Sequence, residues 1–177
     1  QGAVIEHQRH IEQLGQEAVV VRYTEQLAEI DGIILPGGES TTMGKLLNRT
    51  GMMEPFREKI QQGMPVWGTC AGMILLAKEL DQDPVVHLGM MDITVRRNAY
   101  GTQIDSFDSQ VSDEQIPLVF IRAPYIVRTG ERVKVLCEVE RHVVAAREKN
   151  MLATSFHPEL TGNAAFHQYF IGMCSGK

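Results

Sequence analysis

The sequence predicts an α/β fold, in which helices flank a doubly wound, mostly parallel sheet that carries an antiparallel extension. In the first half of the chain, the short apolar runs at 33–35 and 65–67 each lead through glycines into a helical pattern. Strands that alternate with helices are typical of a parallel sheet. In the second half, β-branched runs follow one another with no helical pattern between them, which favours an antiparallel extension.

The expected elements follow from hydrophobic periodicity and from turn residues. In the first half we expect helices at 3–14, near 43–48 and at 55–62, and strands at 18–21 and 33–35. After a helix that starts at about Ala71, we expect strands at 92–95, 118–122, 133–137, 143–147 and 151–155, and a last helix at 164–173. The antiparallel extension would therefore come from the second half.

The composition indicates a single domain over residues 1–177 with a sizeable core, since 44% of the 177 residues are hydrophobic and 22% are charged. A net charge of −5 with mixed signs favours neither a nucleic-acid nor a membrane surface. The three cysteines, Cys70, Cys137 and Cys174, are odd in number and lack metal-ligand spacing. We therefore expect a reducing compartment, the cytoplasm, and no metal site.

The histidines outside the motif at 155–161 are scattered along the chain, at His7, His10, His87, His142 and His167. Their spacing matches no metal-ligand pattern. We expect them to be exposed to solvent or satisfied by hydrogen bonds.

The most informative segment is Gly68-Thr69-Cys70-Ala71-Gly72, which stands between an apolar strand-like run and a helical pattern. It has the form of the strand–turn–helix nucleophile elbow, with cysteine in the place of serine. Glycines on both sides allow a strained turn and close packing of the neighbouring elements. A buried structural cysteine is the alternative, but the paired glycines favour a nucleophile.

A general base is predicted near the end of the chain, in Ser155-Phe156-His157-Pro158-Glu159. A histidine can take the proton of a thiol, and a carboxylate two residues later can fix the tautomer of its ring and stabilise its cation. An isolated His-Pro-Glu would also suit a loop. Together with the elbow it predicts the catalytic residues Cys70, His157 and Glu159.

Gly37 and Gly38 follow the strand predicted at 33–35 and present bare backbone N–H groups. Such groups can stabilise a developing oxyanion. The residues that follow, Ser40, Thr41 and Thr42, are expected to cap the next helix. The cap does not account for the two glycines, so we expect them to serve the site.

Five motifs in this order resemble those of the glutaminase subunits of pyridoxal 5'-phosphate synthase, within the class I, triad-type glutamine amidotransferases. They are LPGGESTTM at 35–43, GTCAG at 68–72, RRNAYG at 96–101, VFIRAP at 119–124 and SFHPELT at 155–161. The resemblance covers essentially the whole chain. It implies a flavodoxin-like α/β fold and hydrolysis of L-glutamine to L-glutamate and ammonia.

The resemblance also implies roles for individual residues. Backbone N–H groups of Gly38 and Ala71 would form the oxyanion site. The residues that would bind L-glutamine are Gly38, Glu39, Ser40, Arg97, Ile121 and Arg122. The resemblance implies no metal and no cofactor, and it implies a separate (β/α)₈ synthase subunit that accepts the ammonia and activates the glutaminase on docking.

The sequence departs from the family pattern at two places. The resemblance implies a strand directly before Gln1-Gly2, and this strand is absent from the sequence. We expect its absence to leave the strands at 18–21 and 33–35 poorly paired. Thr102 stands where relatives usually carry arginine, so a contact through this position is in question.

Two alternatives remain open from the sequence. The first is a glutaminase subunit that serves another acceptor, such as an imidazole-forming synthase. The second is a non-hydrolytic protein of similar fold that uses Cys70 as a redox sensor. The His-Pro-Glu motif at 157–159 argues against the redox sensor.

Overall fold

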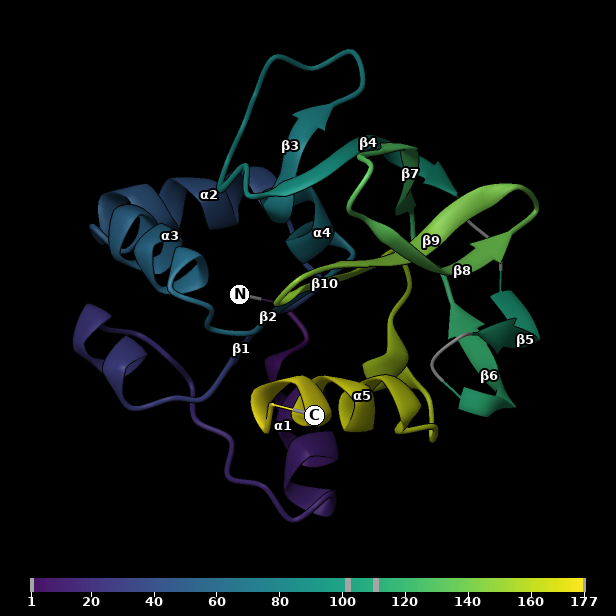
Figure 1. The fold of residues 1–177 in the computed structure, drawn as a ribbon, viewed down its shortest axis with the longest axis horizontal. Helices are drawn as coiled ribbons and strands as arrows, with labels where there is room; N and C mark the ends of the chain where they lie inside the picture. Colours follow the sequence, from purple (N-terminus) through teal and green to yellow (C-terminus); the bar gives the residue numbers. More distant parts are fainter. Residues whose placement is uncertain (1, 101–102, 110–111, 177) are drawn as a thin grey trace.

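The computed structural model describes residues 2–100, 103–109 and 112–176, and it is built on a central sheet of eight strands (Figure 1). The order of the strands is β1-β2-β10-β9-β7-β4-β3, and β8 pairs with β9. Their bounds are β1 Ile33–Leu35, β2 Val66–Thr69, β3 Ala77–Leu80, β4 Met91–Tyr100, β7 Ala123–Thr129, β8 Lys134–Val139, β9 His142–Glu148 and β10 Met151–Thr154. A separate pair joins β5 (Gln103–Ser109) to β6 (Ser112–Val119).

Helices lie on both faces of the sheet (Figure 1). They are α1 Val4–Gln13, α2 Ser40–Arg49, α3 Met53–Gln61, α4 Ala71–Leu76 and α5 Ala165–Cys174, with short 3₁₀ turns η1 Thr24–Ala28 and η2 Pro158–Leu160. Successive side chains of a strand point to opposite faces. In β2, Val66 joins the apolar core that contains residues of α2, α3 and α4, whereas Trp67 joins the core that contains α5. The predicted doubly wound arrangement is therefore confirmed.

The sheet combines a parallel part with an antiparallel extension, as predicted. β1 and β10 both run parallel to β2, and β3 runs parallel to β4. β9 then pairs antiparallel with β10, β8 and β7, and β7 pairs antiparallel with β4. This arrangement brings the C-terminal ends of β1, β2 and β10 to the same edge.

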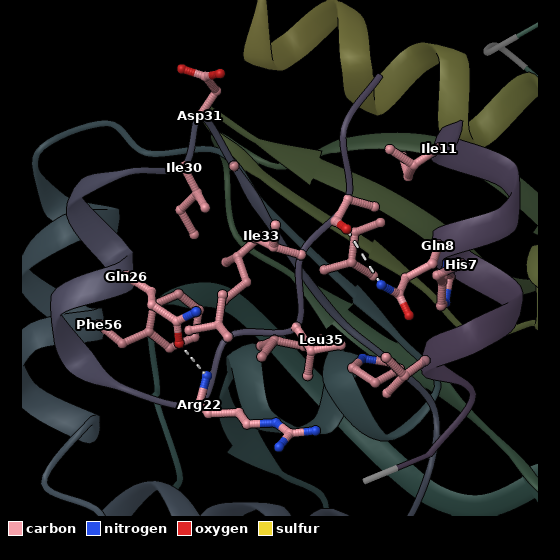
Figure 2. A pocket seen from close by; sticks show the side chains of 18 of the residues that line it. His7, Gln8, Ile11, Arg22, Gln26, Ile30, Asp31, Ile33, Leu35 and Phe56 are labelled. Atoms are coloured by element: carbon pink, nitrogen blue, oxygen red, sulfur yellow. Dashed lines mark hydrogen bonds between the residues drawn. The ribbon is translucent and has the colours of Figure 1, made fainter. Parts of the chain in front are cut away.

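The expected strand at 18–21 is wrong, because these residues form irregular chain. A strand needs a neighbour that satisfies its backbone N–H and C=O groups, and β1 is hydrogen-bonded to β2 alone among the described strands. Between residues 18–22 and β1 lies a cavity of about 740 Å³ (Figure 2). Residues 18–21 thus pair with no described strand, whereas all three residues of β1 pair with β2.

The boundaries of the expected strand at 118–122 are also wrong. β6 ends at Val119, and Ile121 and Arg122 form a bend before β7. Strand β3 directly follows α4 and was missed, because Ala77–Leu80 continues an apolar helical pattern. Tertiary pairing with β4 decides its conformation.

Candidate active site

Cys70 lies at the turn between β2 and α4, where the chain folds as the elbow motif predicts. Its backbone has φ 48° and ψ −101°, a region that non-glycine residues rarely adopt. Its N–H donates to the carbonyl oxygen of Thr154 at 2.8 Å, which ties the turn to β10. A Cβ on Gly68 would overlap the backbone of Gly72, and a Cβ on Gly72 would overlap the backbone of Leu35. Both glycines are therefore required by close packing.

His157 and Glu159 form a buried pair just beyond β10. Nδ1 of His157 lies 2.8 Å from Oε1 of Glu159, and the two residues are 8% and 4% exposed. Because a carboxylate only accepts hydrogen bonds, Nδ1 carries the proton and Nε2 is left for a reacting group. Pro158 begins the turn η2, so the segment is a 3₁₀ turn with the proline in its first position.

The pKa of His157 depends on its interactions with Cys70 and Glu159. Burial lowers the pKa of His157, but hydrogen bonds to Cys70 and Glu159, together with their negative charges, outweigh burial and raise the pKa to about 10. The imidazolium form of His157 is therefore favoured at neutral pH. A ring with these partners can exchange a proton with a group bound at the Cys70 turn.

The glycine pair after β1 packs against the ring of His157. A Cβ on Gly37 would overlap Cε1 of the His157 ring, and it would lie 3.0 Å from Nδ1. A Cβ on Gly2 would in turn overlap the carbonyl of Gly37. The predicted oxyanion loop and the start of the described chain therefore lie next to His157.

Glu39 caps helix α2, which corrects the expectation that Ser40, Thr41 and Thr42 would supply the cap. Its carboxylate accepts from the N–H groups of Thr41 and Thr42 at 3.0 and 2.7 Å. Hydrogen bonds from the Thr42 hydroxyl and from these two N–H groups lower the pKa of Glu39 to about 2. The sequence pattern suggested serine and threonine because they are frequent caps, but α2 begins one turn earlier than expected, at Ser40.

Arg97 joins the same end of α2. Its guanidinium donates to the Ser40 hydroxyl at 3.2 Å, and it lies 3.8 Å from Oε1 of Glu39. It also pairs with Asp83 at 3.1 Å. The fold thus brings together three of the predicted glutamine-binding residues, Glu39, Ser40 and Arg97, and Asp83 is a partner that the sequence analysis missed.

Ile121 and Arg122 lie at the exposed bend before β7, where Arg122 has φ 45°. Thr102 lies outside the described residues. Within 2–100, 103–109 and 112–176, no group of three or more histidine, cysteine, aspartate or glutamate side chains could hold a metal ion. In the same residues, no helix is long and apolar enough to cross a membrane.

A cluster of buried histidines, which the sequence pattern does not predict, lies beside the His157–Glu159 pair. His7 and His10 on α1 and His167 on α5 are 4%, 8% and 0% exposed. Their rings contact one another, with centroid distances of 5.1 Å for His7 and His167 and 4.3 Å for His10 and His167. The fold therefore gathers three of the five histidines that are scattered in the sequence, and His7 lies beside Glu159.

A doubly wound sheet with a cysteine elbow and a nearby histidine–carboxylate pair is the architecture of the triad-type glutamine amidotransferases. Comparison with known proteins agrees: residues 1–176 match the SNO glutamine amidotransferase family, and the chain belongs to that family. The resemblance found in the sequence motifs is thereby confirmed.

Named relatives and a solved structure are similar over nearly the full chain. The pyridoxal 5'-phosphate synthase subunit PdxT of Clostridium acetobutylicum is 56% identical over 176 residues, covering 97% of this chain and 95% of the relative. The PdxT subunit of Clostridium kluyveri is 58% identical, with coverages of 98% and 95%. A crystal structure of a glutamine amidotransferase aligns with a TM-score of 0.90 at 41% identity, covering 99% of this chain and 95% of that one.

Proposed function

We propose that this chain is the glutaminase subunit of a pyridoxal 5'-phosphate synthase, which hydrolyses L-glutamine and delivers the ammonia to a synthase subunit. The observation that carries the proposal is the buried His157–Glu159 pair, 2.8 Å apart, coupled to the strained Cys70 turn. The acceptor is argued from the relatives, which are named as subunits of that synthase.

In the first step, the Cys70 thiolate attacks the side-chain amide carbon of glutamine. The carbonyl oxygen becomes an oxyanion, and the backbone N–H groups of Gly38 and Ala71 donate to it. Ala71 is the first residue of α4, so its N–H has no acceptor within that helix. The His157 imidazolium then gives its Nε2 proton to the leaving nitrogen, and ammonia departs as the thioester forms.

In the second step, water hydrolyses the thioester. Neutral His157 takes a proton from the water, which attacks the thioester carbon and releases L-glutamate and the Cys70 thiolate. Glu159 keeps the Nδ1 proton in place during both steps and stabilises the imidazolium. The cycle consumes one water and needs no metal or organic cofactor.

Glutamine would be held beside the N-terminus of α2. Arg97 is positioned by Ser40 and Glu39 and can pair with a substrate carboxylate. The backbone around Gly38 and the bend at Ile121 and Arg122 would complete the binding residues.

We further propose a cytoplasmic location. All three cysteines are free thiols, and Cys137 and Cys174 carry a pKa raised chiefly by burial, to about 12 and about 11. A reducing compartment keeps such thiols and the nucleophile unoxidised. Fractionation of cells that express the chain tests this location.

The test of function uses the complex with the synthase subunit and two nitrogen sources. Cys70→Ala should abolish synthesis of pyridoxal 5'-phosphate from glutamine and leave synthesis from added ammonia at the wild-type rate, because the thiol serves amide cleavage alone. Loss of both activities would mean that Cys70 is structural. Wild-type protein that releases no glutamate with the synthase present would refute the proposed function.

A further inference from the structure

The second oxygen of Glu159 has no role in the pair with His157. Oε1 accepts from His157, whereas Oε2 is buried and has no hydrogen-bond partner among the described residues. The side chain of Glu159 is 0% exposed, so water does not reach this oxygen freely. A buried carboxylate oxygen without a donor is destabilising, which makes the nearest donor important.

That donor is His7 of α1, whose Nε2 lies 3.5 Å from Oε2 of Glu159. Figure 2 shows His7 on α1 at the wall of the cavity beside β1. Nε2 also lies 3.5 Å from the hydroxyl of Thr69, the last residue of β2. A shift of a few tenths of an ångström would bring Nε2 within ordinary hydrogen-bond distance of Glu159.

The tautomer of His7 is set on its other side by His167. Nδ1 of His7 lies 3.0 Å from Nε2 of His167. If His167 donates from Nε2, His7 carries its single proton on Nε2, directed at the carboxylate. The opposite tautomer would place a bare ring nitrogen against a negative oxygen, which is unfavourable.

His7 carries one ring proton at neutral pH. Burial lowers its pKa to about 4; Glu159 and Glu6 raise it, and the nearby His10 and His157 lower it. Burial, with the charges of His7 and His10, likewise lowers the pKa of His167 to about 2. Both rings are therefore neutral, so each nitrogen is either a donor or an acceptor.

The two rings are also held in place by packing. Trp67 forms T-shaped contacts with His7, with centroids 5.5 Å apart, and with His167, with centroids 4.9 Å apart. His10 stacks on His167, and its Nε2 donates to the carbonyl of Thr161 at 3.1 Å. A ring fixed on several sides can orient its neighbour without a large loss of side-chain entropy.

We propose that His7 is a positioning residue for glutamine hydrolysis, which holds Oε2 of Glu159 and thereby orients His157 toward the thiol, with His167 fixing its tautomer. The proposal rests on the proposed glutaminase function. His7 acts through Glu159 and does not touch the substrate. A residue that contacts a catalytic side chain, and not the substrate, can hold that side chain in its reactive orientation.

The experiment measures glutamate release by the complex with the synthase subunit. His7→Leu removes the donor and keeps apolar volume, and we expect kcat to fall roughly 10-fold with KM for glutamine unchanged, from the loss of one hydrogen bond to a charged group. His7→Gln retains a donor at similar reach and should recover most of the rate. Ile11→Ala, one turn along α1 at the wall of the cavity, is the matched control: it should lower the melting temperature and leave kcat within about twofold.

A double variant separates positioning from general damage. In a Glu159→Gln background, His7→Leu should change kcat by less than about twofold, because its effect passes through the carboxylate. Equal kcat for His7→Leu and wild type, or an undiminished effect in the Glu159→Gln background, would overturn the proposal and leave the glutaminase function intact. Wild-type protein without glutaminase activity would overturn both.

Discussion

The buried histidines predict how the stability of the fold depends on pH. The pKa of His7 is lowered to about 4 and that of His167 to about 2, both mainly by burial, from an ordinary value of 6.5. As the pH falls below 6.5, the unfolded chain binds protons at these positions and the folded chain does not. The free energy of unfolding must therefore decrease on acidification, until each folded pKa is reached.

The size of the effect follows from the two shifts. Each pH unit below 6.5 removes about 1.4 kcal/mol for each neutral histidine, so the two together remove about 4 kcal/mol by pH 5. His157 acts in the opposite sense: its pKa is raised to about 10, so its stabilisation is complete below 6.5 and is lost as the pH rises through 10. Between pH 7 and pH 5, His157 therefore adds about 1 kcal/mol to the free energy of unfolding. The net loss is about 3 kcal/mol, with maximal stability near pH 6.5.

Urea unfolding at pH 5, 6 and 7 measures this directly, and a thermal scan should show a melting temperature lower by about 8 °C at pH 5. His167→Gln removes one titrating ring, so the net loss between pH 7 and pH 5 should fall from about 3 to about 1 kcal/mol, even if the variant is less stable overall. An unfolding free energy that is flat between pH 7 and pH 5 would refute the reasoning. A wild-type slope in His167→Gln would show that other groups titrate.

Three further predictions concern activity. Gly37→Ala should lower glutaminase turnover by about 10²-fold or more, because the new Cβ would overlap the His157 ring. The control is Gly172→Ala, in open space on α5, which should raise the free energy of unfolding by about 0.5–1 kcal/mol and leave the turnover rate unchanged. His157→Asn should remove nearly all turnover and Glu159→Gln less, since the carboxylate only orients and stabilises the ring; equal loss in the folded variants would contradict this ranking. Glutamate release should rise about 10²–10³-fold with saturating synthase, because docking would orient the oxyanion-binding N–H group of the pair Gly37-Gly38. Equal rates with and without synthase would exclude activation by docking.

The local motifs could be predicted because their information lies within a few residues. The spacing of Gly68, Cys70 and Gly72 implies a tight turn, and the structure gives Cys70 the positive φ that such a turn requires. His157 and Glu159 are two residues apart and meet through a single turn. The elbow, the pair and most helices were therefore accessible from sequence.

Features that depend on distant partners were not accessible. His7 and His10 are three apart on a helix, which indicates a shared face, but His167 is 160 residues from His7 and no pattern links them. Likewise, nothing local distinguishes β3 from a continued helix, or residues 18–21 from a strand. Pairing with β4 decides the conformation of β3, and none of the described strands pairs with residues 18–21.

The central claim, that Cys70 attacks the glutamine amide, is tested most directly by labelling with a glutamine analogue that carries a chloroketone in place of the amide. In the complex with the synthase subunit, peptide mapping by mass spectrometry should find the label on Cys70, and excess glutamine should prevent it, because substrate and analogue occupy the same site. Cys137 and Cys174, whose raised pKa values disfavour the thiolate, should stay unlabelled. Labelling of either of these cysteines in place of Cys70, or labelling of Cys70 that glutamine does not prevent, would contradict the account.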